Sequence, residues 1–336
     1  MKINENDIFT PDITDLNAHL VYPCVKMEKT DYYVIETVKD NSEKAKAFAE
    51  EINGSVLGDF EKQGDKMCHV STFCYVGDKI YVSYYASVDS NEENPNFQTA
   101  RLAYAPIEDM NNKTVIDIMS VGDNLKGHKV INVYDTILMR KEDEPQNIYI
   151  LWTAFIDDQY FRLYRIFNVE TEELGDINVN RFKVGDTAND FSTSGMKNAL
   201  AINGIGYKEM RSDIGIMQKL TSRNENGVTY YYTGAYSGNF NCIIKSCDLI
   251  TWEYVAQPDE GEGAFRNDTL WENAVYVLDD KAYYFIRQWQ ASIDDEGKPI
   301  EEVNRNTWGS DYGILTCFDL QTKTWSKPVL VGDSQS

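Results

Sequence analysis

Positive charge is scarce in this sequence. The 336 residues include 32 Lys and Arg against 54 Asp and Glu, which gives a formal net charge of −22 at pH 7. A nucleic-acid-binding protein needs a cationic surface against the phosphates, and docking on an anionic membrane also requires basic residues. The charge balance therefore argues against both partners. It also disfavours a long polyanionic substrate, although a local basic pocket remains compatible with a single acidic group.

Several other features are also lacking. No apolar run approaches the roughly 18 residues that a membrane-spanning helix needs. The first residues show no basic segment followed by an apolar one, so we expect no signal peptide and a cytoplasmic location, with secretion as the alternative if a signal has been removed. The six cysteines form no CxxC pair, so their spacing predicts neither a zinc site nor a disulfide framework, and we expect free thiols. No phosphate-binding or H-E-x-x-H motif occurs, so no cofactor or metal is predicted; a structural calcium on a ring axis stays open.

Aromatic residues, in contrast, are abundant, with 22 Tyr, 14 Phe and 6 Trp. They suit β-strands, and their rings can also stack on sugars. An aromatic-rich strand pattern occurs five times, and a Val-Gly-Asp sequence closes three of the units, at 121–123, 184–186 and 331–333. The five copies of the strand pattern are at 31–36, 78–85, 146–152, 227–233 and 280–286.

The spacing of these copies predicts the fold. The implied unit ends near 59, 122, 185, 259 and 332 lie 63 to 74 residues apart, with room for about four strands each. We expect an all-β protein, a single β-propeller domain over 1–336 with five blades or alternatively six. A β-sandwich is the alternative, but it leaves the repeats unexplained. The predicted repeats are 19–59, 69–123, 131–186, 190–259 and 265–333, with a helix at 41–54 and a polar loop at 186–196.

One stretch resembles a known group of enzymes. Residues 246–253 read Ser-Cys-Asp-Leu-Ile-Thr-Trp-Glu, and residues 270–285 continue as Leu-Trp-Glu-Asn-Ala-Val-Tyr-Val-Leu-Asp-Asp-Lys-Ala-Tyr-Tyr-Phe. We expect the aspartate of the first turn to accept backbone N–H groups while its tryptophan packs between blades. This succession resembles the five-bladed propeller glycoside hydrolases, the clan of β-fructosidases, arabinanases and β-xylosidases. The resemblance implies that Glu272 is the general acid that protonates the leaving oxygen.

A second propeller family is similar in the same turn. Sialidases have turns of the form S-x-D-x-G-x-T-W, and the turn here is one residue shorter and lacks the glycine. That resemblance implies a tyrosine nucleophile with a glutamate partner, and three arginines that converge on a substrate carboxylate. The sequence leaves open whether three of its arginines converge.

In a propeller, the first residues of the innermost strand of each blade face the centre, where binding sites gather. The residues at that position in each repeat are therefore our candidate site residues. This position is occupied in successive repeats by His19 with Tyr22, His69, Asp135, Asp190 or the nearby Asn198, and Glu272. Glycoside cleavage needs two carboxyl groups, and we expect Glu272 and Asp135 to supply them, with Asp190 in reserve. His69 is an alternative acid or base. The competing interpretations are a structural Glu272, a turn acceptor at Asp135 and a core histidine at His69.

The substrate-binding residues are expected around this centre. They are His19, Tyr22, Arg101, Trp152, Tyr236 and Arg287. The predicted function is a glycoside hydrolase that removes a terminal sugar from an oligosaccharide, its expected partner. The alternatives are a sialidase-like exo-glycosidase on an acidic sugar, a polysaccharide lyase, and a carbohydrate-binding propeller without catalysis. The oligomeric state stays open.

Overall fold

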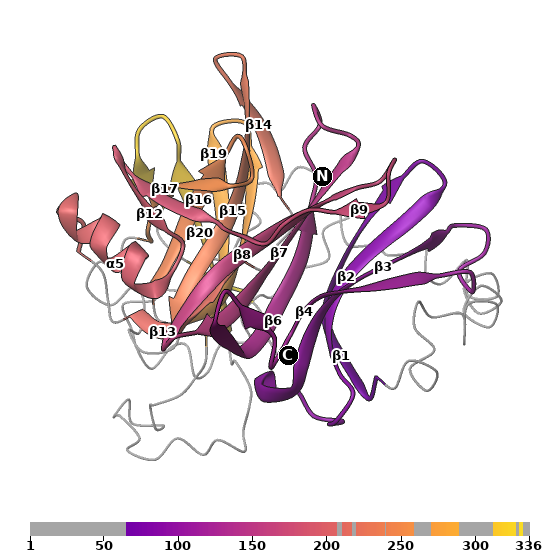
Figure 1. The fold of residues 1–336 in the computed structure, drawn as a ribbon. Helices are drawn as coiled ribbons and strands as arrows, with labels where there is room; N and C mark the ends of the chain where they lie inside the picture. Colours follow the sequence, from indigo (N-terminus) through magenta and orange to yellow (C-terminus); the bar gives the residue numbers. More distant parts are fainter. Residues whose placement is uncertain are drawn as a thin grey trace.

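The protein is an all-β structure in which four sheets follow one another in chain order (Figure 1). The computed structural model describes residues 65–206, 210–216, 220–238, 240–258, 270–288, 312–326 and 329–331. The predicted first repeat at 19–59, the predicted helix at 41–54, and both His19 and Tyr22 lie outside these residues. Five blades therefore stays a prediction.

The first two sheets are antiparallel and cover residues 67–179. Sheet 1 contains β1 (Met67–Val76), β2 (Lys79–Ser87), β3 (Gln98–Pro106) and β4 (Thr114–Ser120), with a short helical turn η3 (Pro95–Phe97) before β3. Sheet 2 contains β5 (Asn124–Leu125), β6 (His128–Met139), β7 (Asn147–Ile156), β8 (Gln159–Asn168), β9 (Glu173–Leu174) and β10 (Asn178–Val179).

The other two sheets complete the described chain. Sheet 3 contains β11 (Arg181–Val184), β12 (Thr187–Asp190), β13 (Met210–Gly215), β14 (Thr221–Glu225), β15 (Val228–Gly238), β16 (Phe240–Ser246) and β17 (Thr251–Ala256). The β11–β12 hairpin joins this sheet through a parallel pairing of β11 with β17. Sheet 4 contains β18 (Leu270–Leu278), β19 (Lys281–Gln288), β20 (Tyr312–Asp319), β21 (Thr324–Trp325) and β22 (Val329–Val331).

The repeating unit is a β-propeller blade. The main strands of each sheet run up and down toward an outer edge, starting from β1, β6, β13 and β18, and the first strands β1 and β6 contact each other. Strands β8 and β13, and then β15 and β18, make the next contacts between sheets. The four predicted aromatic strands within the described residues are β2, β7, β15 and β19, the second main strand of each sheet. The chain is therefore an all-β propeller.

Hydrophobic clusters lie between successive sheets. One joins sheets 1 and 2 around Trp152 and Phe167, another joins sheets 2 and 3 around Trp252 and Phe182, and a third joins sheets 3 and 4 around Tyr284. Full burial of a large apolar side chain contributes roughly 1.5–3 kcal/mol. A blade presents an apolar surface on either side, and packing against its neighbour removes that surface from water.

The predicted turn geometry is confirmed at the β16–β17 hairpin. Asp248 Oδ1 accepts hydrogen bonds from the backbone N–H groups of Ile250 and Thr251, at 2.8 and 2.7 Å, while Trp252 is fully buried. The same design recurs in two other blades, where Asn168 and Asp319 accept two backbone N–H bonds each after the third strand. The repeat is thus more regular in structure than in sequence.

The predicted loop at 186–196 is wrong. Its first part forms β12, and a helix, α5 (Thr193–Ile202), begins within it. Ser192 caps this helix by accepting the N–H of Gly195, and Met196 and Leu200 are buried on its inner face. The helix was missed because its first turn is polar and its buried residues, Met196, Ala199 and Leu200, form only a short apolar pattern. Within the described residues, no helix is long and apolar enough to cross a membrane.

Candidate functional site

Irregularities in the first strands mark one region of the propeller. In β1, β6 and β18 two residues stand opposite a single residue of the next strand, so each strand contains a β-bulge. The residues of the bulges are 70–71, 135–136 and 271–272. In β13 the interruption is longer, because residues 211–214 stand opposite one residue of β15. Bulges direct side chains away from the regular ladder and are frequent beside active sites.

Asp135 has the most constrained position in these bulges. Its backbone φ is +51°, in the left-handed region, and its side chain is buried with 4% exposure. Arg162 is fully buried beside it and donates from Nη1 to the Asp135 carbonyl oxygen at 2.8 Å and to Thr153 Oγ1 at 2.9 Å. Its Nη2 donates to the carbonyl oxygen of Ile216 at 2.9 Å. Burial lowers the pKa of Arg162 to about 10, and Asp135 opposes this shift.

Tyr236 completes the surroundings of Asp135. Its hydroxyl donates to Asp135 Oδ2 at 2.9 Å across the boundary between sheets 2 and 3. The tyrosine ring lies directly over Gly215 of β13, where a Cβ atom would overlap the ring carbons. Glycine at 215 therefore makes room for the approach of Tyr236 to the carboxylate. The predicted site residues Asp135 and Tyr236 are brought together by this close packing.

A second group of contacts lies around Tyr85 in sheet 1. The Tyr85 hydroxyl donates to Glu93 Oε1 in a short hydrogen bond and lies 2.8 Å from His69 Nδ1. His69 Nδ1 also lies 3.1 Å from Glu93 Oε2. Tyr85 is buried, whereas the side chains of His69 and Glu93 are 55% and 51% exposed. His69 is therefore accessible and paired, rather than a core histidine.

Glu272 lies in the bulge of β18. Arg287, the residue of β19 that faces this bulge, donates from Nη1 to Glu272 Oε2 at 2.8 Å. The Glu272 side chain is 29% exposed, and within the described part of the chain its Oε1 accepts no hydrogen bond.

These contacts belong to one site, which we call the inner-strand cluster. Burial is the main cause that raises the pKa of Tyr85, and Asp135, Glu93 and Glu272 each raise it further. The three carboxylates come from three different sheets and act on one hydroxyl, Glu93 through a hydrogen bond and Asp135 and Glu272 through their charges. The members of the inner-strand cluster are His69, Tyr85, Glu93, Asp135, Arg162, Tyr236, Glu272 and Arg287.

Three predicted site residues lie elsewhere. Trp152 faces the β6 bulge, but it is fully buried and donates from Nε1 to Met119 Sδ in the core. Arg101 is buried in sheet 1, where it forms ion pairs with Asp65 and Asp117. Asp190 ends β12 at the outer edge of sheet 3, exposed to solvent. Core packing occupies Trp152, ion pairs occupy Arg101, and position separates Asp190 from the cluster.

Three members of the cluster were not predicted. Tyr85 belongs to a repeated aromatic strand, which the sequence indicates only as a core element. Arg162 interrupts an apolar strand, Phe161-Arg162-Leu163, and a lone arginine in that setting is a usable signal for a buried polar network. Glu93 follows β2 in a polar connection, where no pattern distinguishes it from its neighbours.

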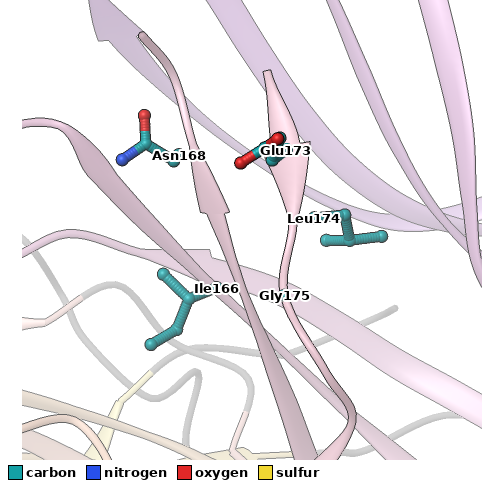
Figure 2. Close-up of a pocket in the computed structure, with 5 residues that line it drawn as sticks. All are labelled: Ile166, Asn168, Glu173, Leu174 and Gly175. Atoms are coloured by element: carbon teal, nitrogen blue, oxygen red, sulfur yellow. The ribbon is translucent and has the colours of Figure 1, made fainter. Parts of the chain in front are cut away.

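Other surface features do not compete with this cluster. Among the described residues, no group of three or more His, Cys, Asp or Glu is arranged to hold a metal ion. Figure 2 shows a shallow hollow at the β8–β9 hairpin, on the outer part of sheet 2. It is lined by Ile166, Asn168, Glu173, Leu174 and Gly175. A single carboxylate there has no second ionisable group for acid–base chemistry.

Known proteins resemble this chain in structure and not in sequence. No family model matches the chain, and no curated protein sequence matches it. Solved structures that match include a Trypanosoma rangeli sialidase (13% identity, TM-score 0.46, 77% of this chain and 37% of that one) and the Hadza microbial sialidase Hz136 (8%, 0.46, 82% and 60%). A Bombyx mori GH32 β-fructofuranosidase also matches (10%, 0.34, 77% and 50%). Sialidases and a β-fructofuranosidase are the kinds of propeller glycosidase that the sequence resembles, and the chain spans less than two thirds of each.

Proposed function

We propose that the protein is a glycoside hydrolase that removes a terminal sugar from an oligosaccharide at the inner-strand cluster. The observation that supports this proposal is the placement of carboxyl groups from three sheets at or beside the first strands: Asp135 and Glu272 directly, and Glu93 through its contact with His69. Two of them, on Asp135 and Glu272, lie in bulges of first strands, where ladder pairing does not determine the side-chain type. Glycosidic bonds are cleaved between two carboxyl groups.

The two groups have different surroundings, and we assign them different roles. Glu272 is partly exposed and lies in a first-strand bulge, so we assign it as the donor of the proton to the leaving oxygen. Asp135 is buried and held by Tyr236, so its charge stabilises the positive sugar ring that develops as the bond breaks. In this proposal His69 positions the Tyr85 hydroxyl, which is in contact with both His69 and Glu93.

Among the described residues, the geometry gives the sialidase-like alternative less support. It requires arginines that are available to a substrate carboxylate. Arg101 is engaged by two aspartates, Arg162 by three oxygen atoms of the protein, and Arg287 by Glu272. A tyrosine nucleophile must also lose its proton, and the raised pKa of Tyr85 opposes that loss. Tyr85 therefore acts as a hydrogen-bond donor in this proposal.

Product analysis tests the proposal. The parent protein and the Glu272→Gln variant are incubated with a panel of plant and host oligosaccharides, and released sugars are identified by mass spectrometry. We expect the parent to release a monosaccharide and the variant to be slower by about 100-fold or more, in the range that loss of a general acid causes. Glu253→Gln, on the outer strand β17, is the matched control and should match the parent.

Three results would contradict the proposal in different ways. Equal release by parent and variant would remove Glu272 from the chemistry. Products with a new double bond would indicate a lyase that uses His69 or Tyr85. Binding of oligosaccharides without any product would indicate the non-catalytic propeller.

A further inference from the structure

A buried asparagine directly follows Glu272 in β18. Asn273 is 6% exposed and lies in the same row of side chains as Val275, which belongs to the hydrophobic cluster between sheets 3 and 4. Its Nδ2 donates to the backbone carbonyl oxygen of Ala235 at 3.0 Å and to Asn241 Oδ1 at 2.6 Å. An amide group in an apolar row is costly to bury unless it is hydrogen-bonded, and hydrogen bonds have a fixed direction. The asparagine therefore orients β18 against sheet 3 as well as packing there.

Sheet 3 makes room for this side chain. Asn273 lies against Gly234 of β15, where a Cβ atom would overlap the Asn273 amide group. The next residue, Ala235, supplies the carbonyl acceptor, and the residue after that, Tyr236, donates from its hydroxyl to Asp135. Three consecutive residues of β15 thus contact one site carboxylate directly and the residue beside the other.

The bulge of β18 makes the anchor at residue 273 important for Glu272. Residues 271–272 stand opposite Arg287 alone, and the regular ladder resumes where Asn273 pairs with Ile286. Because a bulge leaves an additional residue without a ladder partner, ladder hydrogen bonds alone do not fix the direction of the side chains in it. The hydrogen bonds of the adjoining asparagine limit how far this part of β18 can shift.

We propose that Asn273 is a positioning residue that ties the bulge of β18 to β15 and so fixes Glu272 relative to Asp135. This inference rests on the proposed function, since it concerns the placement of the same two carboxyl groups. Asn273 acts through the backbone that it shares with Glu272 and through residues 234–236, which also hold Asp135. A misplacement of about 1 Å in a reacting group can lower the rate about 100-fold.

Crystal structures and kinetics of Asn273→Val test the proposal. Valine matches the side chain two residues further along the row, so it should keep the sheets packed while it removes both hydrogen bonds. We expect the Glu272 carboxyl group to move by about 1 Å relative to Asp135. The expected kinetic effect is a fall in kcat of about 100-fold with KM changed by less than about threefold, because the placement matters as the bond breaks.

Tyr284→Phe is the matched control. The Tyr284 hydroxyl donates to the same acceptor, Asn241 Oδ1, at 3.3 Å, and its removal leaves both hydrogen bonds of Asn273 in place. This variant should lower the unfolding temperature as a member of the same buried group, while kcat and the position of Glu272 stay as in the parent. An equal fall in kcat in Tyr284→Phe would indicate general loosening of the interface and contradict the positioning role.

The outcomes separate this inference from the proposed function. If Asn273→Val leaves Glu272 in its original place, or turns over substrate like the parent, the inference is wrong. If that variant does not fold, Gly234→Ala displaces the same amide group from the opposite strand, and the same criteria apply to it. If the parent protein cleaves no glycoside, the hydrolase proposal fails, and the crystal structures alone decide whether Asn273 places Glu272.

Discussion

The strongest test of the site geometry is a set of substitutions at Asp135. Asp135→Asn keeps the size of the side chain, its tolerance of a left-handed backbone and an oxygen for the Tyr236 hydroxyl. It removes the charge beside Arg162. Arg162 bonds the carbonyl oxygen of Asp135 rather than its carboxylate, but the Asp135 charge is the largest influence that favours the charged form of this fully buried arginine, and leaving a buried charge without its compensating neighbour costs about 3 kcal/mol or more. We therefore expect Asp135→Asn to lower the free energy of unfolding by about 3 kcal/mol.

Asp135→Ala and Asp135→Gly separate the contribution of the backbone. Both lose the hydrogen bond from Tyr236, which adds about 1–2 kcal/mol to the cost. Alanine at φ +51° also pays a left-handed penalty of roughly 1–2 kcal/mol, which glycine avoids. The expected order of stability is Asp, Asn, Gly and then Ala. Equilibrium unfolding in urea, with linear extrapolation to water, measures each difference.

Asp157 provides the matched control. It has a nearly identical φ of +50° in the β7–β8 turn, but its side chain is 60% exposed. Asp157→Asn should change the free energy of unfolding by no more than about 0.5 kcal/mol, while the difference between its Gly and Ala variants should persist. Equal stability of Asp135→Gly and Asp135→Ala would contradict the claim that the left-handed backbone at residue 135 costs alanine stability. A neutral effect of Asp135→Asn would refute the charge balance with Arg162.

Three further predictions concern other parts of the structure. Gly215→Ala should displace the Tyr236 ring from Asp135, and a crystal structure of the variant in which that hydrogen bond is intact would contradict the prediction. Asp248→Ala should lower the free energy of unfolding by about 1–2 kcal/mol in urea titrations, because two backbone N–H groups lose their acceptor. Hydrogen bonds, chiefly from Lys141, lower the pKa of Glu144 to about 2, below about 4.3 in the unfolded chain, so its contribution to stability is complete above pH 4.3 and is lost as pH falls through 2. Stability measured between pH 5 and 2 should therefore fall less steeply in Glu144→Gln than in the parent protein, and parallel curves would contradict this cause.

The sequence predicted the elements whose information is local. Aromatic alternation located the second main strand of each described sheet, and the Asp248 turn was predicted with its acceptor role and buried tryptophan. Local spacing was less informative for the site. His69, Asp135 and Glu272 were aligned as equivalent positions, but Asp135 and Glu272 occupy the first and second residues of their bulges, and His69 precedes its bulge.

The remaining site contacts depend on tertiary structure. Arg162 reaches oxygens on β6, β7 and the end of β13, which are up to 54 residues distant along the chain. The approach of Tyr236 to Asp135 spans 101 residues. Trp152 and Arg287 both stand opposite a bulge, but their side chains go different ways. Trp152 points into the core, whereas Arg287 points toward Glu272. Which side of the strand carries function is decided by packing between sheets, not by the pattern along one strand.

The bulges have a consequence for how this protein can change. A residue in a regular strand position is constrained twice, by its ladder partner and by the neighbouring sheet. The additional residue of a bulge has no ladder partner of its own, so its side chain can be exchanged while the hydrogen-bonded framework stays intact. Three blades have such positions in their first strands, at residues 70–71, 135–136 and 271–272. Side chains at these positions can thus diversify one blade at a time, while the ladders of each blade are preserved.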